Sequence, residues 1–189
     1  MLTRILGLSL IGLASSAALA APETYTIDSR HTFPSFEVSH LGFSTQRGRF
    51  NITTGKIIID RQARTASAEI TIDVRSVDTG LDKLEAHLVA EDFFHATKHP
   101  TIRFKSNASR FEGDKLVALH GDLTMRGVTK AVVLDVTAFH CGLNPLVKKQ
   151  ACGADAETKV KRSDFGIRYA LPAVGDEVKI LIQAEAHKE

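Results

Sequence analysis

The residues of this 189-residue chain best suited to chemistry are its eight histidines and the acidic residues near them. His95 and His99 are four residues apart, a spacing that on a helix would put two imidazoles on one face as metal ligands, with Glu91 nearby. Pro100 follows at once, and the helical pattern fades there. We therefore expect surface or loop histidines and no metal site.

A second candidate is the run Asp28-Ser29-Arg30-His31, whose residue types are those of acid–base catalysis. A serine–histidine–aspartate site requires that the three side chains meet in space, and an Asp–Ser pair near the start of a strand is more typical of a turn. The chain has no GxSxG, GxxxxGKS/T, HExxH or GxGxxG motif. We therefore expect neither an enzyme nor a bound cofactor.

The two cysteines, Cys141 and Cys152, both lie in the loop-like stretch HCGLNPLVKKQACGADA. A disulfide between them would close a loop of roughly 12 residues and stabilise the fold by about 3 kcal/mol through chain entropy. A metal or redox pair is the weaker alternative, because the spacing lacks a CxxC motif. We predict a disulfide, which fits an oxidising compartment.

Residues 1–20 have the composition of a targeting segment. Arg4 supplies a positive start, Ile5–Leu13 an apolar core, and Ala18-Leu19-Ala20 a small-x-small cleavage signal. The apolar core is shorter than the ~20 residues that a spanning helix needs, so we expect a signal peptide cleaved after Ala20 and no stable membrane anchor. The mature domain would comprise residues 21–189, and in a Gram-negative bacterium it would be periplasmic.

The composition is that of an ordinary globular protein, with 43% hydrophobic and 24% charged residues. The formal net charge is only +2 at pH 7, and the sequence has no long basic stripe. This weak charge argues against nucleic acid as the main partner.

Apolar and polar residues alternate at every second position along most of the chain. In the stretch 68–75 (AEITIDVR) the even positions are apolar and the odd ones polar, which predicts a half-buried strand. Val117 and Leu119 share one parity in the same way. The pattern predicts further strands near residues 36–40, 48–59, 102–105, 117–125, 132–137, 158–162 and 177–186.

Only the stretch 81–88 has a helical period, with Leu81, Leu84 and Leu88 at i, i+3 and i+7. About eight antiparallel strands, one short helix and no β–α–β alternation indicate an all-β sandwich or barrel. Periodicity does not choose between the two. Roughly 170 residues in about eight long strands suit a lipocalin-sized barrel, whose interior can hold one small ligand. The charges from Lys159 to Arg162 are expected on solvated faces.

The same segments resemble the YceI-like family of periplasmic, lipocalin-like proteins that bind lipids or polyisoprenoids. The resemblance runs in order through about residues 24–187; each motif is weak alone, but the ordered set is specific. The chain departs from the family pattern around the helix, at Glu85, His95 and His99. The main matching segments are Tyr25–Thr32, Phe36–Ser44, Gly48–Phe50, Ser76–Gly80, Asp92–Phe94, Pro100–Phe104, Leu123–Lys130 and Arg162–Ile167.

The resemblance implies an extended eight-stranded antiparallel barrel with one helix beside it. It also implies that the apolar interior holds a long-chain amphiphile, such as a polyisoprenoid, a fatty acid or a fatty amide, as a carrier, store or scavenger. Some relatives are fused to membrane cytochrome b domains. This leaves, as the alternative, a metal- or quinone-linked periplasmic redox accessory that uses the His-rich segment. The family is not securely enzymatic, so no catalytic residue is carried over, and the sequence leaves a homodimer open.

A cavity in such a barrel would take its wall from the apolar parity of the strands. Polar groups at a rim are predicted at His31, His40, Arg126 and Lys130. The predicted ligand contacts are Phe36, Val38, Phe43, Phe50, Ile70, Ile72, Phe104, Leu119, Leu123, Leu134, Val136, Phe165, Ile167, Ile180 and Ile182.

Overall fold

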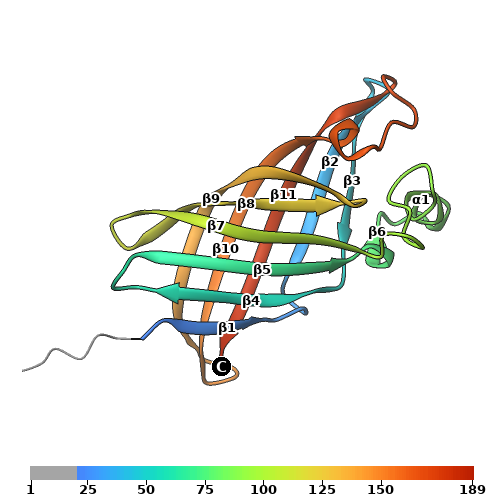
Figure 1. Ribbon diagram of the computed structural model, residues 1–189. Coiled ribbons are helices and arrows are strands. Elements are labelled where there is room, and N and C mark those ends of the chain that lie inside the picture. Colours follow the sequence, from blue (N-terminus) through green and yellow to red (C-terminus); the bar gives the residue numbers. More distant parts are fainter. Residues whose placement is uncertain (1–20) are drawn as a thin grey trace, which may run out of the picture.

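The structure, a computed structural model, describes residues 21–189, so the predicted signal peptide at 1–20 lies outside the described residues. Eleven strand segments form one antiparallel sheet that closes into an eight-stranded barrel with an α-helix at its side (Figure 1). This confirms the predicted fold class. The segments are β1 Glu23–Ile27, β2 Phe33–His40, β3 Ser44–Phe50, β4 Thr53–Asp60, β5 Thr65–Asp73, β6 Val77–Asp78, β7 Thr101–Glu112, β8 Lys115–Met125, β9 Val128–Asn144, β10 Lys149–Lys161 and β11 Val174–Lys188.

The barrel closes because β1 pairs with β4 on one side and with the end of β11 on the other. After a bend at residues 28–32, β2 continues the path of β1 and pairs with the first part of β11. A matching bend at residues 51–52 separates β3 from β4, and the 3-10 helix η1 (Val74–Ser76) separates β5 from β6. These three interruptions are why eleven segments make eight barrel strands.

The α-helix α1 (Asp82–Leu88) lies where the helical period predicts it. Leu88 is buried, whereas Leu81 is exposed and precedes the first turn. The Glu85 side chain accepts a hydrogen bond from the Thr79 backbone N–H at 2.8 Å, which ties the helix to the strand before it. No helix within residues 21–189 is long and apolar enough to cross a membrane.

Cys141 and Cys152 lie opposite each other on β9 and β10 and form the predicted disulfide, with their Cα atoms 4.0 Å apart. The prediction that this stretch is a loop is wrong, because β9 and β10 stay paired as far as Asn144 and Lys149. The alternation that would reveal these strands is interrupted by the extra residue Thr137, a bulge in β9, and by small residues near the disulfide.

A second bulge corrects the predicted parity of β8. Ala118 pairs with Arg110 and Leu116 with Phe111, so Val117 is the extra residue between them. Because one inserted residue reverses which side chains face inward, Leu116 rather than Val117 shares the inner face with Leu119.

Two groups of buried apolar side chains form the core. One contains Tyr25 and Ile59 of the β1–β4 pair and reaches β9, β10 and β11. The other lies near α1 and contains Phe50, Val74 and Phe165. Residues from both groups line the space inside the barrel.

Candidate functional site

The barrel encloses a cavity of about 240 Å³. Its wall is made almost entirely of aliphatic and aromatic side chains that point inward from the strands. All the predicted wall residues except Phe43 and Phe165 line it: Phe36, Val38, Phe50, Ile70, Ile72, Phe104, Leu119, Leu123, Leu134, Val136, Ile167, Ile180 and Ile182.

Phe43 and Phe165 do not line the cavity. Phe43 is 89% exposed, because it follows a left-handed turn through Leu41 and Gly42 at the end of the β2–β3 hairpin. Alternation cannot be extrapolated through such a turn. Phe165 is buried, but it belongs to the 3-10 helix η2 (Arg162–Phe165) and packs in the core behind the wall.

Several wall residues were not predicted from the sequence. Leu88, Phe93 and Phe94 reach the cavity from the helix and the segment after it, which carry no strand parity. The Phe94 ring meets Phe50 edge-on, with centroids 5.6 Å apart. Phe139 lies beyond the bulge in β9, which moves it to the inner face.

Two glycines on the strands make room for phenylalanine rings in the wall. A Cβ on Gly48 would lie 2.4 Å from the Phe36 ring, and one on Gly121 would lie 2.8 Å from the Phe104 ring and 2.5 Å from a backbone oxygen. Any larger residue at either position would collide with a ring of the cavity wall, so only glycine fits beside these two phenylalanines.

The wall offers very few hydrogen bonds. Thr32 uses its hydroxyl on the backbone of Glu185, to which it donates and from which it accepts a hydrogen bond. The Thr53 hydroxyl is fully buried and has no partner within residues 21–189. Such a lining binds hydrocarbon well and binds polar groups poorly.

Arg162 is buried, so the prediction that it lies on a solvated face is wrong. Arg162 follows the end of β10, two residues after the inward-facing Val160. Its side chain also points inward, lines the cavity and is only 6% exposed. The guanidinium donates hydrogen bonds to the backbone carbonyls of Ile167, Tyr169, Val174 and Gly175.

These bonds hold the segment 167–175 across one end of the barrel. Burial lowers the pKa of the Arg162 guanidinium, but Arg has so high a pKa that it stays charged. Arg162 is therefore a structural tie at this end of the barrel.

The segment after α1 is tied to the same end. The rings of His87, Phe93 and Tyr169 form a cluster with centroids 4.8 to 5.5 Å apart, which joins this segment to the loop after η2. Arg126, predicted at a rim, donates to the backbone carbonyls of Glu91 and Phe93. The guanidinium of Arg126 is therefore engaged by the backbone of this segment.

The run that resembles an acid–base site is a structural cluster around one buried carboxylate, Asp28, while Ser29, Arg30 and His31 are exposed. Asp28 accepts hydrogen bonds from the backbone N–H and the guanidinium of Arg30, and contacts His31 Nδ1 at 3.0 Å and His187 Nε2 at 3.2 Å. The Arg30 guanidinium, helped by the two imidazoles, holds the pKa of the Asp28 carboxyl far below its usual range. Ser29 makes no side-chain hydrogen bond within residues 21–189, so no nucleophile is placed beside His31.

The His95–His99 pair lies in turns rather than on a helix. The His99 backbone N–H donates to the His95 carbonyl at 2.8 Å, and His95 has a left-handed backbone. The two ring centroids are 5.9 Å apart. Burial lowers the pKa of the His99 imidazole. In the part of the chain that the structure describes, no three His, Cys, Asp or Glu side chains gather as a metal site.

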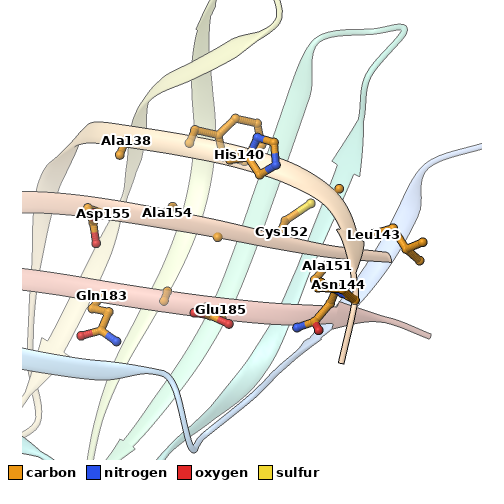
Figure 2. A pocket seen from close by; sticks show the side chains of 15 residues that line it. Ala138, His140, Leu143, Asn144, Ala151, Cys152, Ala154, Asp155, Gln183 and Glu185 are labelled. Carbon is orange, nitrogen blue, oxygen red and sulfur yellow. The ribbon is translucent and has the colours of Figure 1, made fainter. Parts of the chain in front are cut away.

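A second hollow, of about 540 Å³, lies on the outer face of β9, β10 and β11 (Figure 2). We call it the outer groove. Its floor is made of small residues, including Ala138, Gly142 and Gly153. The polar side chains of His140, Asn144, Asp155, Gln183 and Glu185 surround this floor, and the groove is open to solvent. Because water competes for such a surface, the enclosed cavity is the better candidate site for an apolar ligand.

A family model described as the YceI-like domain matches residues 25–186. The chain belongs to the YceI-like family. Protein YceI of Shigella flexneri is 36% identical over 184 residues, which cover 96% of this chain and 95% of that protein. Protein YceI of Salmonella arizonae is 34% identical over 184 residues, with 96% and 95% covered. The resemblance stated from the sequence motifs is confirmed.

Two solved structures share the fold of this YceI-like chain. BcnA of Burkholderia cenocepacia matches with a TM-score of 0.73 at 24% identity, covering 85% of this chain and 99% of BcnA. A polyisoprenoid-binding domain from Saccharophagus degradans matches with a TM-score of 0.67 at 17% identity, covering 87% of this chain and 98% of that domain. At these identities the likeness concerns the architecture of the barrel.

Proposed function

We propose that this protein is an exported carrier, store or scavenger that holds the hydrocarbon chain of a long-chain amphiphile inside its barrel. The ligand class is a polyisoprenoid, a fatty acid or a fatty amide. The observation that carries the proposal is the enclosed cavity of about 240 Å³, whose wall is almost wholly apolar. No catalytic residue is needed for this role.

Hydrophobic transfer supplies enough free energy for the role. Burying one methylene stabilises a complex by about 0.8 kcal/mol, so a tail of ten carbons supplies about 8 kcal/mol before the cost of immobilising the chain. A charged head group held by an exposed lysine or arginine would add only about 0–1 kcal/mol, because water and salt screen it. We therefore expect the tail to dominate the affinity.

Two further observations support the proposal. The related domain from Saccharophagus degradans is described as polyisoprenoid-binding, and its barrel has the same fold. The Cys141–Cys152 disulfide and the signal-like sequence ending at Ala20 favour an oxidising compartment, the periplasm if the source is a Gram-negative bacterium.

Titration with a homologous series of saturated fatty acids, and in parallel with prenols, tests the proposal. We expect the association constant to rise about fourfold for each added methylene until the cavity is full, and then to level off. It should change little between low and moderate salt. An association constant that is independent of chain length but falls steeply with salt would contradict the proposal. Mass spectrometry of an organic extract of the purified protein would identify the natural ligand.

A further inference from the structure

The turn between β9 and β10 exposes apolar side chains at the end of a projecting hairpin. We call residues 143–149 the hairpin tip. Leu146 is 89% exposed, Leu143 is 63% exposed, and Val147 is also exposed. In Figure 1 this hairpin extends past the barrel at the end where the C-terminus is marked, away from the β2–β3 turn. These aliphatic side chains are left exposed to solvent.

The backbone N–H groups of the turn need little water. The Asn144 side-chain oxygen accepts hydrogen bonds from the N–H groups of Leu146 at 2.9 Å and Val147 at 3.3 Å. The Lys148 N–H donates to the Asn144 carbonyl at 2.8 Å, and Pro145 has no N–H. Every backbone donor of the turn itself is therefore satisfied within the turn. This removes the share of the N–H donors in the cost of moving a turn out of water.

The charged side chains of the hairpin tip are all positive. Lys148 and Lys149 are exposed, and neither forms an ion pair with any side chain in residues 21–189. The sequence has no acidic residue between His140 and Asp155. The tip therefore presents two cations beside its aliphatic side chains, and this pattern is typical of segments that lie at an anionic membrane surface.

The hairpin tip is also held in shape. The Cys141–Cys152 disulfide crosses the hairpin immediately behind it, and β9 pairs with β10 up to Asn144 and Lys149. A preformed tip loses little conformational entropy when it meets a surface.

The opposite end of the barrel provides a comparison. The β2–β3 turn exposes Leu41 and Phe43, but the arginine that follows it in the sequence, Arg47, is paired with Glu37, and the stretch 41–47 contains no lysine. Both turns thus expose apolar side chains, but only the hairpin tip, of these two turns, has unpaired lysines next to them in the sequence.

We infer that the hairpin tip docks reversibly on a lipid bilayer that contains anionic lipids. Leu143 and Leu146 enter the boundary between head groups and acyl chains, and Lys148 and Lys149 lie among the phosphates. This contact goes beyond the proposed ligand-binding function and does not depend on what the cavity holds.

Co-sedimentation of the purified protein with vesicles tests this inference, with phosphatidylethanolamine–phosphatidylglycerol vesicles compared against phosphatidylcholine vesicles. We expect binding to the anionic vesicles that weakens with salt. Leu143→Ser with Leu146→Ser should lower the binding constant at least tenfold. Lys148→Gln with Lys149→Gln should lower it about fivefold for each lysine, and only on anionic vesicles. The matched control, Leu41→Ser with Phe43→Ser at the other end, should bind as the wild type does.

A fluorescence experiment locates the contact independently. The chain has no tryptophan, so Leu146→Trp and Phe43→Trp each introduce a single reporter at one end. On adding anionic vesicles, the emission of Leu146→Trp should shift to shorter wavelength and that of Phe43→Trp should not. The inference is overturned if wild-type protein fails to bind anionic vesicles, if the Phe43 end gives the shift instead, or if the leucine pair governs self-association rather than vesicle binding.

Discussion

The inner and outer faces of β9, β10 and β11 carry two hollows of opposite character. The outer groove, of about 540 Å³, is open to solvent, whereas the cavity, of about 240 Å³, lies inside the barrel. The floor of the outer groove is made of small residues, and polar side chains such as Asp155 and Gln183 surround it. The cavity wall is made of large apolar residues such as Leu134 and Ile182. The chemistry of the lining therefore decides which hollow suits a lipid.

The difference between the two hollows follows from strand geometry. Successive side chains point to opposite faces, so one strand contributes apolar residues to the cavity and polar or small ones to the groove. Removing a hydrocarbon from water is favourable in proportion to the apolar area that becomes buried, and the inside of the barrel buries more of it than the outer face.

A charge placed inside the barrel should have the largest effect. Ile72 lines the cavity and the adjacent Thr71 does not. Ile72→Asp puts a carboxylate with no partner into an apolar space, which we expect to lower the free energy of unfolding by about 4 kcal/mol or more. Thr71→Asp, on the other face, should change it by about 0.5 kcal/mol or less. Chemical denaturation measures both, and equal midpoints would show that the inside–outside assignment of β5 is wrong.

Placing a tryptophan in each hollow should show which of the two holds the ligand, because only the variant in that hollow should bind it more weakly. Leu134 lines the cavity and Ala138, on the same strand, lines the outer groove. We expect Leu134→Trp to weaken binding of a long-chain fatty acid about a hundredfold, because the ring takes space that several methylenes would occupy. Ala138→Trp should leave the affinity within about twofold. Titration calorimetry provides the measurement, and the reverse ranking would assign the ligand to the groove.

The parity of the strands made most of the cavity predictable from the sequence. Positions such as Ile70 and Ile72, or Ile180 and Ile182, follow an uninterrupted alternation, and they line the cavity as expected. Alternation fails where a bulge inserts a residue, and it therefore gave no indication that Leu116 or Phe139 lies on the inner face. A bulge depends on pairing between distant strands, and a single strand's pattern does not contain that information.

Arg162 shows a second limit of sequence analysis. A cationic residue at the end of a strand is usually solvated, and nothing in the local pattern shows that four carbonyls from residues 167–175 will surround it. Burial of a charge depends on such long-range partners. The outer groove was missed for a related reason, because a hollow formed by glycine and alanine has no pattern of its own in the sequence.

The smallest expected effect concerns Asp28, a natural buried carboxylate. Unlike the carboxylate of Ile72→Asp, it has hydrogen-bond partners. Asp28 is buried at the bend between β1 and β2, and it is held by Arg30, His31 and His187. Its folded-state pKa lies below the unfolded value, so the stabilisation is fully present above about pH 5 and is lost as the pH falls toward the folded-state value.

We expect the wild type to lose about 1–3 kcal/mol of unfolding free energy from this group between about pH 5 and pH 2. In Asp28→Asn, that part of the pH dependence should be absent and the stability at neutral pH should already be lower. Asp122→Asn, an exposed carboxylate outside the ion pairs of residues 21–189, is the matched control and should keep the wild-type slope. Urea denaturation across this pH range measures all three. An unchanged slope in Asp28→Asn would mean that its hydrogen bonds do not distinguish the folded from the unfolded state. In that case the partners of Asp28 would give it no advantage over the carboxylate of Ile72→Asp, which has no partner. The expected difference between these two buried carboxylates would then be wrong.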